Sequence, residues 1–158
     1  MKILIRPKYK KFDEARFDAL IEKLEDTLYK TGADYKEAPK YTDCVTAIRY
    51  ILENSSDIVL PRVYIWDMPK SLLEDFWATK ISQKLWRKWD LIFFEKMSFR
   101  HKKYMISHVG ILISESEFFH SSFHFEGGNI SSVRDIDYNA LILDESFLDI
   151  AKDPRNNP

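Results

Sequence analysis

The chain has 158 residues, and its 24 Lys and Arg against 25 Asp and Glu give a formal net charge of −1. This length predicts a single folded domain over 1–158, and the composition, 45% hydrophobic and 31% charged, excludes disordered, collagen-like and coiled-coil chains. Because positive charge is not in excess, we expect no nucleic-acid partner and no attraction to an anionic membrane.

The N-terminal segment lacks the pattern of a standard export signal. Its apolar run, 3–5, is three residues long, whereas the apolar region of a secretory signal needs about seven or more. The longest uncharged apolar-rich run, 104–114, is shorter than the roughly 20 residues that cross a bilayer as a helix. We expect a protein that does not span a membrane and that is cytoplasmic, or exported by a route without a standard signal peptide.

Helical periodicity dominates the first half of the chain. Apolar residues at helical offsets over 17–28 predict an amphipathic helix that ends near Gly32. The same spacing over 44–52 predicts a second helix, which begins at Thr42 or Asp43 because either side chain can cap it.

Strand patterns dominate the second half, after a third helix that is expected to open at Pro69. Beyond Trp89, β-branched and aromatic residues alternate with turn residues, which predicts antiparallel strands. The predicted strands are 91–94, 104–114, 117–125 and 138–143. Helices followed by antiparallel strands indicate an α+β fold, and 152–158 is expected to be a frayed end.

Cys44 is the single cysteine, which excludes an internal disulfide and a multi-cysteine metal site. Its predicted place in the first turn of a helix is where backbone N–H groups and the helix dipole stabilise a thiolate. The same residue also fits the apolar stripe of that helix as a small buried side chain. Position alone leaves both interpretations open.

A cysteine nucleophile needs a base, and the base needs a group that orients it, so the four histidines are the candidates. If 104–113 and 117–125 form a hairpin centred on Ser114, His108 lies directly opposite His120. Directly opposed residues have Cβ atoms about 4.5–5.5 Å apart. The spacing therefore predicts that His120 orients His108.

Strand alternation over 117–125 predicts one polar face and one core face. The polar face carries His120, Ser122 and His124, and the core face carries Phe119, Phe123 and Phe125. The spacing of His120 and His124 also suits zinc ligands on a helix, but on a strand the two lie roughly 13 Å apart. We therefore expect no metal and no cofactor, and a structural role for His101 and His124.

Five short strings occur in a fixed order along the chain: YTDC at 41–44, LPR at 60–62, WDLIFF at 89–94, ISHVGI at 106–111 and FHSS at 119–122. In this order they resemble the NlpC-type cell-wall peptidases, a family of papain-like cysteine hydrolases. Among the five strings, the one at 107–111 is the most specific for this family. The resemblance implies a papain-like fold, in which N-terminal helices, with the nucleophile at a helix N-terminus, pack on an antiparallel β-sheet.

Site residues follow from the resemblance one by one. It implies that Cys44 is the nucleophile, His108 the base and His120 the orienting residue. Tyr35 and Asp43 correspond to residues of the pocket that binds the substrate's amino terminus. The implied reaction is hydrolysis of an amide bond in a peptidoglycan stem peptide, typically between D-glutamate and a diamino acid. The expected partner is thus a peptide or muropeptide substrate.

Departures from the family pattern keep other functions open. Val45 stands where the family has a serine that helps to bind the substrate, and Trp89 replaces a glycine. Two alternatives remain: an amidase or acyltransferase of papain-like fold with a non-wall substrate, and a non-catalytic binding module that keeps the fold. The basic loop 96–103 is either a clamp for a substrate carboxylate or a solvated loop. The patterns give no prediction of oligomeric state.

Overall fold

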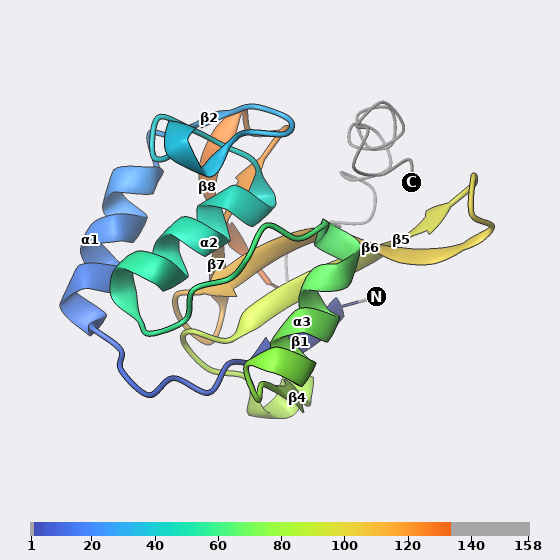
Figure 1. Cartoon of the computed structure of the whole chain (residues 1–158), viewed down its shortest axis with the longest axis horizontal. Helices are drawn as coiled ribbons and strands as arrows, with labels where there is room; N and C mark the ends of the chain where they lie inside the picture. Colours follow the sequence, from blue (N-terminus) through green and yellow to red (C-terminus); the bar gives the residue numbers. More distant parts are fainter. Residues whose placement is uncertain (1, 134–158) are drawn as a thin grey trace.

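One β-sheet with the strand order β3-β2-β8-β7-β6-β5-β1-β4 organises this computed structural model, which describes residues 2–133 (Figure 1). The strands are β1 Lys2–Arg6, β2 Leu28–Tyr29, β3 Tyr41–Thr42, β4 Thr79–Ile81, β5 Leu91–Ser98, β6 Lys103–Leu112, β7 Glu117–Ser122 and β8 Gly127–Ser132. β2 and β3 pair in parallel, and the other pairs are antiparallel. The predicted strand at 138–143 and the predicted frayed end lie outside the described residues.

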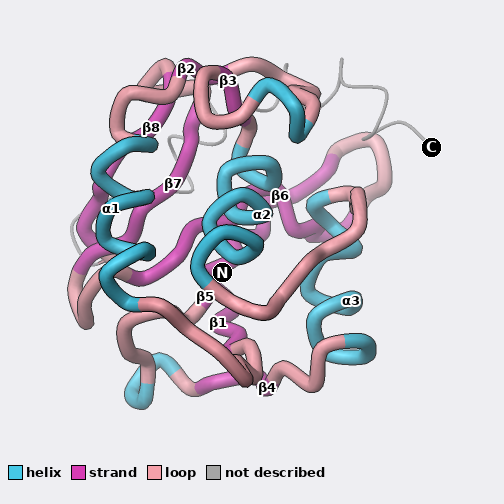
Figure 2. Tube along the Cα trace, turned by 60° about the vertical axis from the view of Figure 1, so that its left-hand side comes forward, coloured by secondary structure: helices cyan, strands magenta, loops and turns pink. Residues whose placement is uncertain are grey.

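Helices cover one face of this sheet. They are α1 Glu14–Leu24, α2 Cys44–Ser55 and α3 Met68–Asp75, with short 3₁₀ turns η1 Tyr35–Glu37, η2 Ile65–Asp67 and η3 Gln83–Leu85. α1 and α2 run side by side, and α2 packs on β6 and β7 (Figure 2). The α+β class is confirmed. Within the described residues, no helix has the length and apolar character needed to cross a bilayer.

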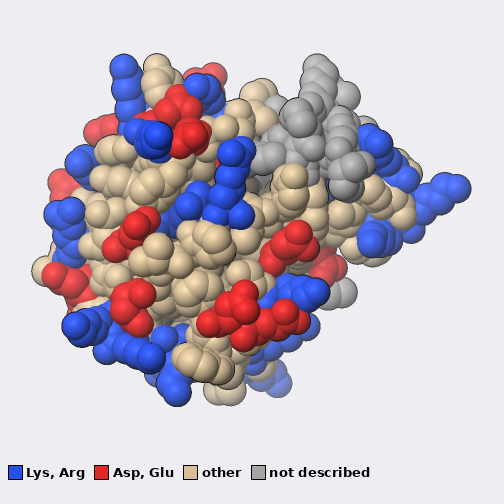
Figure 3. All heavy atoms as spheres, viewed as in Figure 1, with Lys and Arg blue, Asp and Glu red and all other residues tan. Residues whose placement is uncertain are grey.

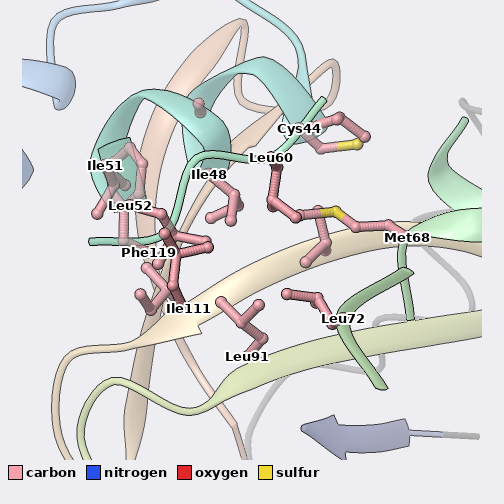
Figure 4. Packing of buried hydrophobic residues seen from close by; sticks show 14 of the residues in the cluster. Cys44, Ile48, Ile51, Leu52, Leu60, Met68, Leu72, Leu91, Ile111 and Phe119 are labelled. Carbon is pink, nitrogen blue, oxygen red and sulfur yellow. The ribbon is translucent and has the colours of Figure 1, made fainter. Parts of the chain in front are cut away.

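α2 begins as its sequence predicts. Asp43 is the N-cap, and its Oδ1 accepts a hydrogen bond from the backbone N–H of Thr46 at 2.7 Å. Further along the helix, Ile48, Ile51 and Leu52 are fully buried. Figure 4 shows these side chains directed toward β6 and β7. The cap therefore sets where α2 starts, and burial of the apolar stripe holds it on the sheet.

α1 ends earlier than predicted. The predicted helix ran on toward Gly32, but α1 stops at Leu24, and Leu28 is 51% exposed in β2. The reason is a close approach by β8: a Cβ at Gly128 would lie 2.0 Å from the carbonyl oxygen of Leu24, and one at Gly127 would lie 1.8 Å from that of Thr27. The chain after Leu24 therefore joins the sheet instead of continuing the helix.

The sheet buries side chains on both faces, which corrects the prediction for β7. Phe119 packs in the helix-side core, and Phe118 packs in a second core on the opposite face. On the predicted polar face, His120 and Ser122 are buried, because β7 lies between β6 and β8 in the sheet, whereas His124 lies beyond the end of the strand and is exposed. The strand also ends at Ser122, which leaves Phe123 and Phe125 exposed instead of in the core.

Candidate active site

The structure brings the two predicted histidines into contact. His108 on β6 and His120 on β7 are both buried, and His108 Nε2 lies 2.9 Å from His120 Nδ1. The rings are nearly perpendicular, at 84°. This distance and the alignment of the nitrogens describe a hydrogen bond in which one ring holds the other.

The register that produces this contact differs from the predicted one. The pairs of the β6–β7 ladder are Ile111 with Phe119 and Leu112 with Phe118. The hairpin is therefore centred on Glu115 and not on Ser114. Continued along the strands, this register sets His120 opposite Gly110, so the hydrogen bond to His108 runs diagonally across the ladder. A two-residue offset keeps both rings on one face, which is why the contact survives the error.

A β-bulge lies beside His108. Phe94 of β5 pairs with His108, but the next residue, Glu95, pairs with Ile106, so Ser107 is an extra residue on β6. Ser107 Oγ donates a hydrogen bond to the carbonyl oxygen of Phe94 at 3.3 Å. Bulges bend a strand and change the direction of its side chains, and they are frequent next to active sites. The local backbone therefore sets the direction of the His108 ring.

Two residues of β8 extend the histidine pair. Ser131 Oγ lies 2.8 Å from His120 Nε2, and Asn129 Nδ2 donates a hydrogen bond to Ser131 Oγ at 2.7 Å. The sequence analysis missed both residues because β8 carries two glycines and little apolar alternation. A signal was available in the sequence: the polar residues Asn129, Ser131 and Ser132 follow the glycine pair 127–128, shortly after the strand predicted at 117–125. With them, His120 has hydrogen-bond partners at both ring nitrogens.

Burial sets the charge of both imidazoles. The pKa of His108 lies well below 6.5 because burial disfavours the charged form and because His120 is close. Burial, with a smaller effect of His124, lowers the pKa of His120 to about 3. Both rings are therefore neutral near pH 7, and a neutral imidazole can accept a proton.

Cys44 is the first residue of α2 and is 9% exposed, at the margin of the helix-side core (Figure 4). A buried hydroxyl pair holds this end of the helix on the sheet. Thr42 Oγ1 donates to Ser121 Oγ at 2.9 Å, and Ser121 Oγ donates to the carbonyl oxygen of Thr42 at 3.3 Å. Ser121 follows His120 directly on β7, so this contact ties the segment before Cys44 to the strand that carries His120.

The two residues expected in a substrate pocket occupy different environments. Asp43 is 1% exposed and caps α2. Tyr35 lies in η1, where the Arg49 guanidinium carbon is 5.0 Å from its ring centroid. Burial and a hydrogen bond with Glu53 raise the pKa of Tyr35 to about 12. Binding of a substrate amino terminus by Tyr35 and Asp43 stays a prediction.

Tyr35 lines a cavity of about 150 Å³ beside the first turn of α2. Val45, the residue after Cys44, forms part of its wall together with Arg49 and Arg62. Asp34 is the one acidic residue of the lining. The cavity thus combines two guanidinium groups with one carboxylate close to the nucleophile's segment.

The outer part of the basic segment 96–103 lies away from the histidine pair, whereas Lys96 is two residues from Phe94, the partner of His108. It forms the end of the β5–β6 hairpin, which projects from the body of the molecule (Figure 1), and Figure 3 shows Lys and Arg side chains gathered there. Lys96 is 5% exposed, whereas Arg100 and Lys102 are exposed. Lys103 lies five residues before His108 on β6, or about 16 Å at 3.3 Å per residue. This arrangement favours a solvated loop over a carboxylate clamp.

Comparisons with known proteins agree with the fold and with the family resemblance. The family model of the NlpC/P60 family matches residues 27–142. NlpC1 from Trichomonas vaginalis is similar in structure, with a TM-score of 0.52 and 18% identity over 82% of this chain and 44% of that chain. The chain thus spans less than half the length of that solved structure. Among curated proteins no match was found. Since the family model covers most of the chain, the protein belongs to the NlpC/P60 family, whose members are in general cysteine peptidases and amidases.

Proposed function

We propose that this protein hydrolyses an amide bond with Cys44 as the nucleophile, His108 as the base and His120 as the residue that orients His108. The observation that carries the proposal is the 2.9 Å hydrogen bond between His108 Nε2 and His120 Nδ1. A base that is held in one orientation by a third group is the arrangement that cysteine and serine hydrolases use. The Thr42–Ser121 contact supports it, because it anchors the segment of Cys44 next to His120.

The hydrogen bonds are compatible with the tautomer that this chemistry needs. His108 accepts the thiol proton at Nδ1 only when its own proton is on Nε2, from which it donates to His120 Nδ1. His120 then carries its proton on Nε2 and donates it to Ser131 Oγ. In this arrangement His108 donates to His120, and His120 donates to Ser131 on β8. Ser131 Oγ can accept the proton of His120, so this contact permits the tautomer of His108 that can act as a base.

The reaction then proceeds in two stages. His108 takes the proton of Cys44, and the thiolate attacks the amide carbonyl. The backbone N–H of Cys44, at the N-terminus of α2, stabilises the oxyanion that forms. His108 returns the proton to the leaving amine, and water hydrolyses the thioester with His108 again as the base. Burial keeps His108 neutral beforehand, and the nearby thiolate offsets its charge after the proton transfer.

The proposed substrate is a peptidoglycan stem peptide, cleaved between D-glutamate and the diamino acid. Such a peptide has free carboxylates on both sides of the bond. Arg49 and Arg62 in the cavity beside Val45 suit a carboxylate, because a guanidinium group binds it through two parallel hydrogen bonds. The cavity lies beside the first turn of α2, so a peptide bound there extends toward Cys44.

Purified stem tetrapeptide and muropeptides test this proposal. Incubation with the protein should release a fragment with a new amino terminus on the diamino acid, detected by mass spectrometry. Cys44→Ala should abolish the cleavage, and His101→Ala should leave it unchanged. Unchanged peptides after prolonged incubation with a reactive Cys44 would contradict the wall substrate.

One observation favours a second substrate class. Val45 is apolar and 5% exposed at the position where the family pattern has a polar serine. The same cysteine and histidine pair acting on a non-wall amide, as an amidase or an acyltransferase, then becomes the alternative. A panel of acyl p-nitroanilides and thioesters distinguishes it, since turnover of these without turnover of muropeptides would favour the alternative. A Cys44 thiol that is inert in the folded protein would instead indicate a binding module.

A further inference from the structure

A larger cavity lies at the other end of α2. It has a volume of about 490 Å³ and is formed by the segment after β1, the start of β4 and the turn before β5. Phe12 in its wall forms a β-bridge with Ser56, just beyond the last residue of α2. A helix of 12 residues spans about 18 Å, so this cavity is remote from Cys44. We propose that it binds a small ligand in which an acidic group is attached to a ring.

Packed aromatic residues form the floor of this cavity. The Phe12 and Trp89 ring centroids are 4.2 Å apart, and those of Tyr9 and Phe12 are 4.8 Å apart. Tyr9 Oη donates a hydrogen bond to the carbonyl oxygen of Trp89 at 3.0 Å. The floor is therefore apolar and held in place before any ligand binds, as is usual for small-molecule sites of about 300–1,000 Å³.

Trp77 stands at the rim in an unfavourable conformation. Its φ is +50°, in the left-handed region that costs a bulky residue roughly 1–2 kcal/mol, and its side chain is 66% exposed. The Lys10 ammonium lies over the indole ring, 5.5 Å from its centroid. The face of the exposed indole that Lys10 does not cover is a flat surface on which a sugar or aromatic ring can stack.

The charges around the cavity are mostly positive. Arg6 binds both carboxylate oxygens of Asp90, at 2.8 and 3.0 Å, which neutralises the one acidic residue of the lining. Lys88 forms ion pairs with Glu14 and Asp18, which are not part of the cavity lining. For the side chains of Lys8 and Arg87, the described part of the chain provides no ion-pair partner. These two exposed cations are therefore available to an anion.

Together the indole and the cations define the chemistry of the ligand. A ring that stacks on Trp77 places an attached carboxylate or phosphate within the field of Lys8 and Arg87. Two sources of this chemistry are a carboxylated sugar and a phosphorylated nucleoside. The floor contributes apolar contact in either case, so the acidic group decides affinity and the ring decides orientation.

Calorimetric titration of the intact protein tests the proposal with four probes. N-acetylmuramic acid and adenosine monophosphate carry the acidic group, and N-acetylglucosamine and adenosine are their neutral counterparts. We expect saturable binding of at least one acid, at least tenfold tighter than its neutral counterpart. Whichever acid binds identifies the source. The proposal would be overturned if neither acid reached saturation up to about 10 mM, or if each neutral compound bound as tightly as its acid.

Two variants locate the binding. Trp77→Gly removes the indole and relieves the positive φ, and Arg87→Gln keeps the backbone N–H that holds Asp90 at 2.9 Å. Each should weaken binding about tenfold without lowering the melting temperature. Trp66→Phe and Arg100→Gln, outside the cavity, should bind as the wild type does, and so should Cys44→Ala. Unchanged affinity in both Trp77→Gly and Arg87→Gln would place the ligand elsewhere and contradict the inference.

Discussion

Thr42 Oγ1 donates a 2.9 Å hydrogen bond to Ser121 Oγ, and this bond joins the residue two before Cys44 to the residue after His120. Both residues are fully buried. Because 79 residues separate them in the sequence, the contact determines how the start of α2 sits on the sheet. The proposed nucleophile and the proposed base lie on different elements, so their relative position depends on contacts of this kind.

Thr42→Val should impair catalysis more than stability. The substitution keeps the shape of the side chain but leaves Ser121 with a single partner in this pair, the carbonyl oxygen of Thr42. We expect a loss of about 1 kcal/mol in the free energy of unfolding and roughly a tenfold fall in kcat, because a small shift of Cys44 misaligns the attack. Urea denaturation and steady-state kinetics measure the two effects. Thr79→Val, at an exposed position of β4, is the control and should change neither. Full activity in Thr42→Val would show that the contact has no positioning role.

Ser131→Ala tests the second contact of His120. The variant removes the hydroxyl 2.8 Å from His120 Nε2, which in the proposed relay accepts the proton of His120. We expect kcat to fall about tenfold or more, with a destabilisation of about 1–3 kcal/mol from the unpaired buried nitrogen. Rescue by Ser131→Thr, which keeps the hydroxyl, separates this effect from a loss of packing. An unchanged pH profile and kcat in Ser131→Ala would exclude Ser131 from the relay.

Removal of the three proposed catalytic residues should have unequal effects. Cys44→Ala and His108→Ala should each abolish turnover, because the nucleophile and the base act as a unit. His120→Ala should retain measurable activity, since His108 keeps its ring but loses the group that orients it. The comparison of kcat/KM among the three variants measures this order. Wild-type activity in His120→Ala would mean that the orienting residue is misassigned, and His124 would be tested next.

Stability should fall in mild acid. Burial lowers the pKa of His120 from 6.5 to about 3 and that of His108 well below 6.5. Below about pH 6.5 the two histidines therefore bind protons in the unfolded state but stay neutral in the folded state. The stabilisation is complete above about pH 6.5 and is lost below it, by about 1.4 kcal/mol per pH unit for each histidine. Between pH 6.5 and pH 5 this amounts to about 2 kcal/mol for His120 alone.

Urea denaturation at several pH values measures this slope. His120→Gln should reduce the slope between pH 6.5 and pH 5. Equal free energies of unfolding at pH 7 and pH 5 in the wild type would show that the imidazoles are not held neutral in the folded state.

Local patterns in the sequence predicted the elements that carry the candidate site residues better than they predicted the pairing of the sheet. The cap at Asp43 and the strand that carries His108 depend on neighbouring residues, and the structure confirms both. The predicted hairpin register was wrong by two residues, because turn residues alone did not distinguish Ser114 from Glu115 as its centre. The predicted contact between His108 and His120 forms despite the wrong register, because imidazole side chains are long enough to reach a diagonal neighbour on the same face.

Features that depend on distant contacts escaped prediction. The first residues were considered only as an export signal, yet Lys2–Arg6 forms β1 between β5 and β4, next to strands more than 70 positions away. α1 ends at Leu24 because the glycines of β8 approach it, and nothing local marks that end. Ser131 belongs to the same unpredicted strand. Tertiary contacts here override local propensity.

The central claim is that Cys44 and His108 act together, and the rate of Cys44 alkylation by iodoacetamide as a function of pH tests it in the folded protein. In the wild type, the rate should rise with an apparent pKa well below the value of about 8.5 for a free thiol, and His108→Ala should move that pKa upward and slow the reaction near neutral pH. A thiol that is inert until the protein unfolds, or a pH profile that is the same in wild type and His108→Ala, would contradict the claim.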